Sequence, residues 1–253
     1  MRLPGPETAM DRENLGDRCG NCGAALSGEY CSACGQRRAE RLSLRRTIGD
    51  GWERLVELDF ALVRTFAGLC RRPGQVVLDY VGGQRLAYSN PFRYAFVITT
   101  ICVIAIHLLD IDVTAPGVPV ETEREKAAVQ LVTSLTVYLF FPAIVLLAAL
   151  QRLVSRSTRF NYAELLVFDA YCIGHGSLIA IVVGPVLAPG TPAGLSLILG
   201  LQTAYLAWCL RGFRGIGWGE AAGRALLLVV GYVALFNLIA LLVINAVAIA
   251  GLL

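Results

Sequence analysis

Four cysteines near the N-terminus have the spacing of a metal site. They form two Cys-x-x-Cys pairs, Cys19 with Cys22 and Cys31 with Cys34, and eight residues separate the pairs. Four thiolates at this spacing can surround one tetrahedral ion, and the glycine after each pair permits the tight turn that directs backbone N–H groups toward sulfur. The pattern predicts a structural Zn²⁺ site with no open position for a substrate.

Other uses of the four thiols stay open at this point. Two disulfides would need an oxidising compartment, and a redox pair or an iron–sulfur centre would use the same ligand type. The segment that holds the four cysteines (19–36), here called the ribbon, is too short to bury enough apolar surface to fold without a metal. We therefore expect zinc to contribute folding free energy here, and we do not expect the site to be catalytic.

A second group of residues that could do chemistry lies within an apolar stretch. Glu164, Asp169 and His175 are ionisable, and such side chains are costly inside a membrane. On a helix, Glu164 and His175 share a face, about 16 Å apart along the axis, and Asp169 lies on another face. The group could carry protons or bind a solute headgroup. The alternative is a neutral His175 hydrogen-bonded to another helix, at Asn237 or Gln202, with the two carboxylates near the headgroups.

The amino-acid composition indicates what kind of protein must position these residues. Of the 253 residues, 56% are apolar and 16% are charged, whereas about 25% of a soluble domain is charged. This shortfall argues against an ordinary soluble enzyme and against a disordered regulator. Fourteen of the 22 Lys and Arg residues lie at or before Arg93. A polar N-terminal third therefore precedes an apolar remainder, and the sequence predicts a membrane protein.

The apolar part predicts an all-α bundle of about five transmembrane helices. Each run is near the roughly 20 residues that cross a bilayer, and a backbone in lipid must satisfy its own hydrogen bonds. A re-entrant hairpin made from the third and fourth runs is the alternative. The expected organisation is a flexible N-terminus (1–18), the zinc ribbon (19–36), basic amphipathic juxtamembrane helices (37–91) and the bundle (92–253), with spans at 92–109, 127–150, 163–187, 193–210 and 225–253.

The distribution of arginine predicts the orientation of these spans. The break after the second span and the break after the fourth each hold three arginines, whereas the break at 110–126 is mainly acidic. The positive-inside rule then places the N-terminus and its ribbon in the cytoplasm. Nothing before Met10 resembles an apolar leader, so the first span itself would direct insertion. We expect a bacterial inner membrane.

The segment between the ribbon and the first span is basic and amphipathic. Arginines from Arg37 to Arg46 precede apolar residues that continue at helical spacing to Leu69. This pattern is typical of a helix that lies in the membrane interface, with its arginines against anionic headgroups; packing against the spans is the alternative. Cys70, which precedes Arg71, is a candidate for S-acylation, and an unmodified thiol is the alternative.

Four short phrases in this region resemble those of a known family. They are Tyr-Cys-Ser-Ala-Cys-Gly-Gln at 30–36, Arg-Arg-Pro-Gly-Gln at 71–75, Tyr-Val-Gly-Gly-Gln-Arg at 80–85 and Tyr-Ser-Asn-Pro at 88–91. Together they resemble an uncharacterised family of bacterial integral membrane proteins with an N-terminal zinc ribbon. The resemblance covers about residues 19–92. It implies a zinc ribbon and a multi-span membrane domain, and it brings no activity.

The same phrases place polar and aromatic residues beside the first span. We expect Arg72, Arg85, Arg93 and Tyr88 to be candidate headgroup contacts, with Tyr88 and Tyr94 as interfacial anchors. Simple anchoring is the alternative to a headgroup or phosphate site.

Three classes of function follow from these features. The preferred class is a non-enzymatic membrane scaffold or assembly protein that binds anionic lipids and recruits a cytoplasmic protein partner through the ribbon. Nucleic acid is not expected, because Glu29 is the only charged residue between Cys19 and Cys34. The alternatives are a transporter or channel for a small solute, ion or lipid that uses the third span, and a membrane enzyme acting on lipid headgroups. Known phosphate-binding and metalloprotease motifs are absent from the sequence, and the oligomeric state stays open.

Overall fold

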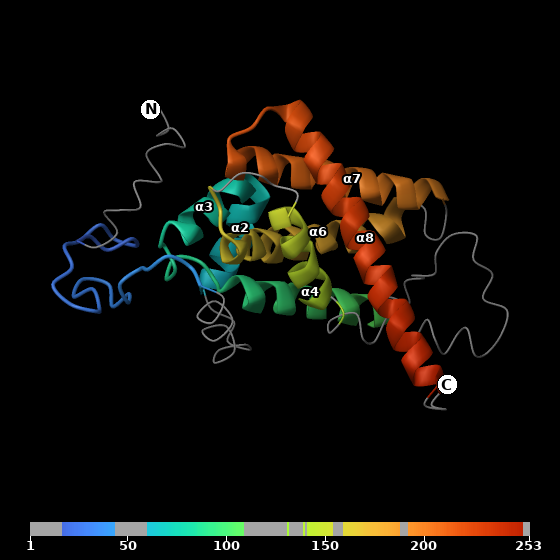
Figure 1. Cartoon of the computed structure of the whole chain (residues 1–253), viewed down its shortest axis with the longest axis horizontal. Coiled ribbons are helices and arrows are strands. Elements are labelled where there is room, and N and C mark those ends of the chain that lie inside the picture. Colours follow the sequence, from blue (N-terminus) through green and yellow to red (C-terminus); the bar gives the residue numbers. More distant parts are fainter. Residues whose placement is uncertain are drawn as a thin grey trace.

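The computed structural model describes residues 17–43, 60–108, 141–153, 159–187 and 192–249, with positions 131 and 139 (Figure 1). Several parts of the expected organisation lie outside these residues. They are 1–16 of the N-terminal segment, 44–59 of the juxtamembrane helices, most of the second span before 141, the breaks at 109–126, 154–158 and 188–191, and the last four residues of the fifth span, 250–253.

Two short helices follow the ribbon, α2 (Phe60–Arg71) and α3 (Pro73–Val81). They separate at Arg72 because Pro73 has no N–H to continue the first helix, although its fixed φ suits the first position of the next one. Most of α3 is buried, including Val77 at 0% exposed. Helix α3 therefore packs into the protein, whereas α2 buries only one face, with Leu62, Thr65 and Leu69.

The longer helices are α4 (Pro91–Leu108), α6 (Tyr162–Leu187), α7 (Pro192–Arg214) and α8 (Trp218–Ile249), with a shorter helix at Phe141–Leu153. Asn90 caps α4, since its Oδ1 accepts hydrogen bonds from the N–H groups of Phe92 at 3.0 Å and Arg93 at 3.4 Å. Pro91 then occupies the first helical position, where a missing N–H has no cost.

The central helix is α6, which lies between α4 and α7 (Figure 1). Its first half is enclosed by protein on every side, as Phe168 and Tyr171 at 0% exposed show. Tyr171 bonds the carbonyl of Ser89 just before α4, and Tyr94 in the first turn of α4 contacts His175 one turn further along α6. The two helices therefore run in the same direction.

Glycines allow α3 and α7 to meet backbone to backbone. A Cβ on Gly74 would lie 2.5 Å from the backbone N of Phe213 and 2.6 Å from the Cα of Gly212, so no side chain fits between the helices. The helix α7 ends at Gly215, which has φ +67° and donates its N–H to the carbonyl of Arg211 at 2.9 Å. This left-handed cap turns the chain into α8.

Among the described residues, three helices are long and apolar enough to cross a membrane: Pro91–Leu108, Ala193–Arg214 and Trp218–Val247. Apolar side chains are exposed along much of α8, with Leu227 67% and Leu242 61% exposed. Such a surface is too extensive for a water-soluble monomer. The described residues contain helices and two isolated bridges but no named strand, which confirms the all-helical class, and the three candidate spans indicate a membrane protein. The number of five spans and their orientation stay predictions.

Candidate metal centre and its docking site

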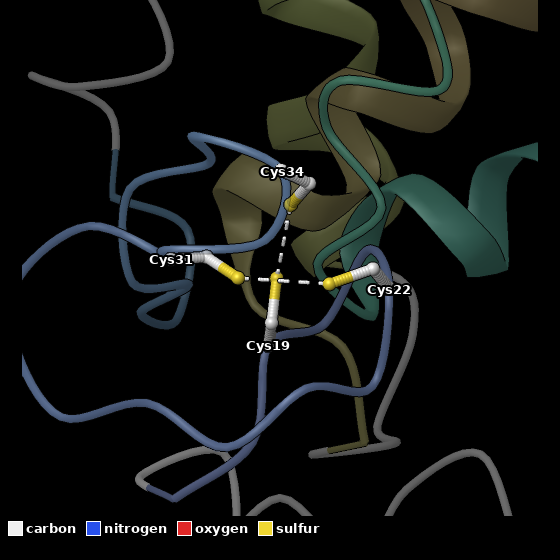
Figure 2. A group of neighbouring side chains, drawn as sticks. All are labelled: Cys19, Cys22, Cys31 and Cys34. Carbon is white, nitrogen blue, oxygen red and sulfur yellow. Dashed lines mark hydrogen bonds between the residues drawn. The ribbon is translucent and has the colours of Figure 1, made fainter.

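The four cysteine sulfurs of the ribbon converge on one point (Figure 2). All lie within 4.8 Å of one another, and the pairs Cys19–Cys34 and Cys22–Cys31 are each 3.6 Å apart. A disulfide needs about 2.05 Å, whereas a tetrahedral ion with bonds of about 2.3 Å to sulfur separates its ligands by about 3.8 Å. A set of four soft donors at this separation fits a bound metal ion.

The backbone around the cluster repeats itself after 12 residues. Gly23 donates its N–H to the carbonyl of Cys19, and Gly35 donates to Cys31, both at 2.8 Å. The two glycines have φ angles of +75° and +74°, in the left-handed region that favours glycine. Each Cys-x-x-Cys-Gly phrase therefore folds into the same tight turn, and the two turns face each other across the sulfurs.

Hydrogen bonds in the turns favour one thiolate. Burial raises the pKa of the Cys19 thiol, but hydrogen bonds from the backbone at Cys22 and Asn21 and from the neighbouring thiols outweigh it and lower the pKa to about 7. For Cys22, a backbone hydrogen bond at Ala24 lowers the pKa, yet the contact with the Cys31 thiol and the other sulfurs raises it to about 12. A metal ion would take the place of the protons that the sulfurs share.

The ribbon is fixed to the helical domain by Gln36, which is 5% exposed. Its amide Nε2 donates to the carbonyl of Gly83 at 2.7 Å, and its Oε1 accepts from the N–H groups of Arg85 at 3.0 Å and Leu86 at 3.1 Å. A Cβ on Gly20 would lie 3.2 Å from the backbone of Gly83. The first turn of the ribbon therefore rests directly on the connection between α3 and α4.

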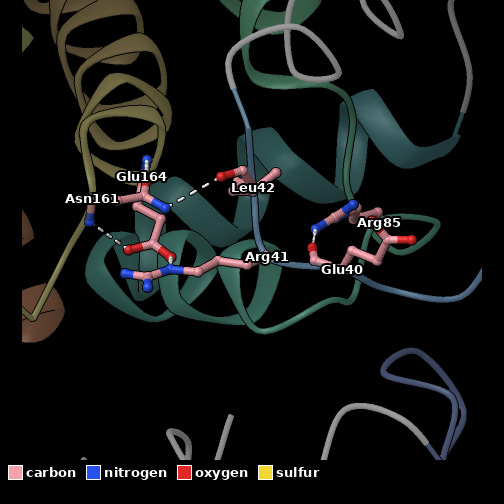
Figure 3. Close-up of polar contacts among 6 residues, drawn as sticks. All are labelled: Glu40, Arg41, Leu42, Arg85, Asn161 and Glu164. Carbon is pink, nitrogen blue, oxygen red and sulfur yellow. Dashed lines mark hydrogen bonds and ion pairs between the residues drawn. The ribbon is translucent and has the colours of Figure 1, made fainter. Parts of the chain in front are cut away.

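The linker after the ribbon is held at two further points (Figure 3). The guanidinium of Arg85 donates to the carbonyl of Glu40. The next residue, Arg41, donates from Nε to Oε1 of Glu164 at 3.4 Å, and that carboxylate is 1% exposed. One segment thus joins the α3–α4 connection to the start of α6.

The start of α6 is a capping box that also binds the linker. Oδ1 of Asn161 accepts from the N–H of Glu164 at 2.9 Å, and Oε2 of Glu164 accepts from the N–H of Asn161 at 2.8 Å. The amide Nδ2 of Asn161 donates to the carbonyl of Leu42 at 3.2 Å. Glu164 therefore has a structural contact at the helix end, and Leu42 at 7% exposed closes the interface.

The four candidate headgroup contacts differ in accessibility. The Arg72 residue is exposed, whereas Arg93 is 4% exposed and lies inside the first turn of α4. Tyr88 donates to Oδ2 of Asp79 at 2.9 Å, and burial, with Asp79 as the next cause, raises the pKa of Tyr88 to about 12. The fourth candidate, Arg85, bonds the ribbon and its linker. The headgroup role stays a prediction.

The structure separates Glu164, Asp169 and His175 into three different contacts. Asp169 is 0% exposed and accepts at Oδ1 from Nε2 of Gln151 at 2.6 Å. Oε1 of Gln151 in turn accepts from Arg214 at 3.4 Å. Oδ2 of Asp169 has no hydrogen-bond partner among the described residues. The three ionisable groups therefore make separate contacts, and a solute site among them stays a prediction.

His175 contacts α4 and α2. Its Nδ1 lies 2.5 Å from the hydroxyl of Tyr94, and its Nε2 lies 3.5 Å from the sulfur of Cys70. Tyr94 was expected at the lipid interface but is 0% exposed, and Tyr171 and His175 of α6 pack against its ring. Asn237, one of the expected partners of His175, instead donates to the carbonyl of Val233 in its own helix at 2.8 Å.

A cavity of about 40 Å³ lies between α6, α7 and α8. Polar groups on its wall come from Ser177, Gln202, Tyr205 and Tyr232. A water molecule needs at least about 10–15 Å³ of such space, so the cavity has room for a few waters.

A family model described as "Protein of unknown function (DUF3667)" matches residues 59–103. The matched stretch covers α2, α3, the connection that binds the ribbon and most of α4. No curated protein and no solved structure matches the chain. The match and the four-cysteine cluster together fit an uncharacterised family of the kind that the sequence phrases resemble.

Sequence reasoning did not find the role of Gln36. It bonds Gly83, 47 positions away, and no local pattern reports such a contact. One signal was available: the ribbon repeats after 12 residues, and Gln36 stands where the first half has Ala24. A long polar side chain at that position, in only one of two equivalent turns, indicates a contact outside the ribbon.

Proposed function

We propose that this chain is a non-enzymatic membrane scaffold whose metal-bound ribbon is a rigid platform for a protein partner. The observation that supports this most is the contact of Gln36 with the α3–α4 connection. Three hydrogen bonds made by one buried side chain fix the ribbon's orientation relative to the helices. A ribbon that only supplied folding energy to itself would not need such an attachment.

We propose that the metal is zinc. Four thiolates and no oxygen or nitrogen donor favour Zn²⁺ in a closed structural site. Purified chain is expected to contain one zinc per molecule by elemental analysis, and Cys31→Ser is expected to contain none. A wild-type chain free of zinc, or one rich in iron, would contradict the assignment.

The surface offered to the partner surrounds Tyr30. This side chain is 61% exposed, and beside it Arg37 and Glu29 form an exposed ion pair at 2.6 Å. Tyrosine is enriched where proteins bind each other, because a large rigid ring with a polar tip contributes contact area at low entropic cost. The ribbon lacks the cluster of cations that nucleic acid would need.

We propose that the helical domain spans a bacterial inner membrane five times, with the ribbon in the cytoplasm. The arginines near the α7–α8 connection support this, since Arg211 stacks on Trp218 at 4.9 Å and an Arg–Trp pair suits a headgroup layer. A membrane-impermeant maleimide added to intact cells is expected to label Asp112→Cys and to leave Arg156→Cys unlabelled. The reverse labelling would contradict the orientation.

The scaffold proposal is tested by purification of the chain from its native membrane. A specific protein partner is expected with the wild type, and it should be lost with Cys31→Ser and Tyr30→Ala. The matched control is Cys102→Ser, which removes a buried thiol of α4 and should retain the partner. Equal recovery from wild type and Tyr30→Ala, or no specific partner from wild type, would contradict the proposal.

A further inference from the structure

The cysteine at the end of α2 stands beside a buried imidazole. Sγ of Cys70 is 3.5 Å from Nε2 of His175, and Nδ1 of the same ring is 2.5 Å from the hydroxyl of Tyr94. The thiol is exposed, whereas His175 is 7% and Tyr94 0% exposed. An accessible nucleophile thus contacts a buried base, and a third group orients that base. This is the arrangement by which proteins activate thiols.

The imidazole is held in place by rings from three helices. Its centroid is 5.1 Å from that of Phe66 on α2, 5.5 Å from Tyr205 on α7 and 6.1 Å from Tyr94 on α4. With Nδ1–H donated to the Tyr94 oxygen, Nε2 presents a lone pair to the thiol and can accept its proton. The packing therefore fixes the nitrogen that faces Cys70.

An apolar surface begins at this thiol. Val63, Phe66 and Cys70 are spaced three and four residues apart and share one face of α2. Val63 is 64% and Phe66 41% exposed, and Phe60 at the start of the helix is 89% exposed. A hydrocarbon chain attached to the sulfur of Cys70 could lie along this face and cover it.

We propose that Cys70 is a self-acylation site that accepts a long-chain acyl group from an acyl-CoA thioester. The S–H proton of Cys70 passes to Nε2 of His175 while sulfur attacks the acyl carbonyl carbon. A new carbon–sulfur bond forms, the donor's carbon–sulfur bond breaks, and the departing CoA thiolate takes the proton from His175. The exposed Arg71 and Arg72 that follow Cys70 supply cations for the phosphates of the donor.

The site is independent of the ribbon and can be tested on the purified full chain in lipid nanodiscs. Incubation with palmitoyl-CoA is expected to increase the intact mass by one palmitoyl group, which neutral hydroxylamine removes. The adduct should be absent from Cys70→Ser and present on Cys102→Ser, a buried thiol of α4 that serves as the matched control. No adduct on wild type, or an equal adduct on Cys70→Ser, would overturn the proposal.

Rates separate an activated thiol from one that is merely exposed. His175→Gln is expected to slow acylation about a hundredfold or more, as loss of a general base does. Tyr94 is a positioning residue, and Tyr94→Phe keeps the ring packing, so it tests the site even where His175→Gln does not fold. We expect Tyr94→Phe to lower the maximal rate about tenfold without changing the half-saturating palmitoyl-CoA concentration.

Two results would contradict these roles. A rate for His175→Gln or Tyr94→Phe equal to that of wild type would show that the imidazole does not activate the thiol. Acetyl-CoA is expected to react much more slowly than palmitoyl-CoA, because its short chain cannot cover the face at Val63 and Phe66. Equal rates for the two donors would overturn the assignment of that face to the acyl chain.

Discussion

Replacing Gln36 with alanine should release the ribbon from the helices without removing its metal. The side chain makes three hydrogen bonds to the α3–α4 connection, each worth about 1 kcal/mol, so docking should weaken by about 3 kcal/mol. The metal should stay, because the turn itself uses the backbone carbonyl of Gln36, which accepts from Cys31 at 2.8 Å.

The assay is hydrogen exchange measured by mass spectrometry on the segment that contains Arg85 and Leu86. The N–H groups of both residues bond Oε1 of Gln36, and a loss of about 3 kcal/mol corresponds to exchange roughly a hundredfold faster. The matched control is Gln75→Ala, which removes an exposed amide of α3 bonded at 2.7 Å to Asp79. Exchange in Gln36→Ala within about twofold of wild type, or an equal acceleration in Gln75→Ala, would refute the docking argument.

Three further substitutions test the structure: two of them test close packing, and the third tests a shifted pKa. Gly20→Ala places a Cβ 3.2 Å from backbone and should speed exchange of the α3–α4 connection, whereas Gly28→Ala, with nothing within 4 Å of its Cβ, should not. Gly74→Ala places a Cβ 2.5 Å from the α7 backbone, so thermal unfolding in detergent should show a loss of about 2 kcal/mol or more; Gly223→Ala, in open space on α8, should be neutral or slightly stabilising. The pKa of Tyr88 is raised to about 12, so the folded state favours the neutral phenol. The stability that this neutral phenol contributes is complete below pH about 10 and is lost as the pH rises toward 12. The difference in phenolate absorbance between wild type and Tyr88→Phe should therefore titrate near pH 12, and a midpoint near 10 would contradict the burial of this phenol and its contact with the Asp79 carboxylate.

The sequence predicted those features that depend on residues close together in the chain. The spacing of Cys19, Cys22, Cys31 and Cys34 indicated four thiols gathered around one point, because two tight turns with glycine are a local property. The first apolar run predicted a helix over 92–109, and α4 occupies Pro91–Leu108, because hydropathy is also read along one continuous segment. The apolar composition gave the helical, membrane-type class.

Residue spacing and composition could not predict the contacts between segments that lie far apart in the sequence. Tyr94 was expected at an interface because tyrosines often anchor spans, yet it is buried and α6 packs against its ring, and this depends on how helices some 80 residues apart align. The first half of α6 is enclosed by protein, although a buried helix and a lipid-facing helix have the same composition. The partner of His175 on α2, Cys70, is 105 positions away, and no periodicity reports that register.

The scaffold account is tested most directly by photo-crosslinking from the exposed surface of the ribbon in living cells. A photoreactive phenylalanine analogue at position 30, which keeps an aromatic ring there, should crosslink one specific protein, and Cys31→Ser in the same chain should abolish the product. The same amino acid at position 75, on the exposed side of α3, is the control and should not give that product. Absence of a crosslink from position 30, or its persistence after loss of the metal ligand, would contradict the account.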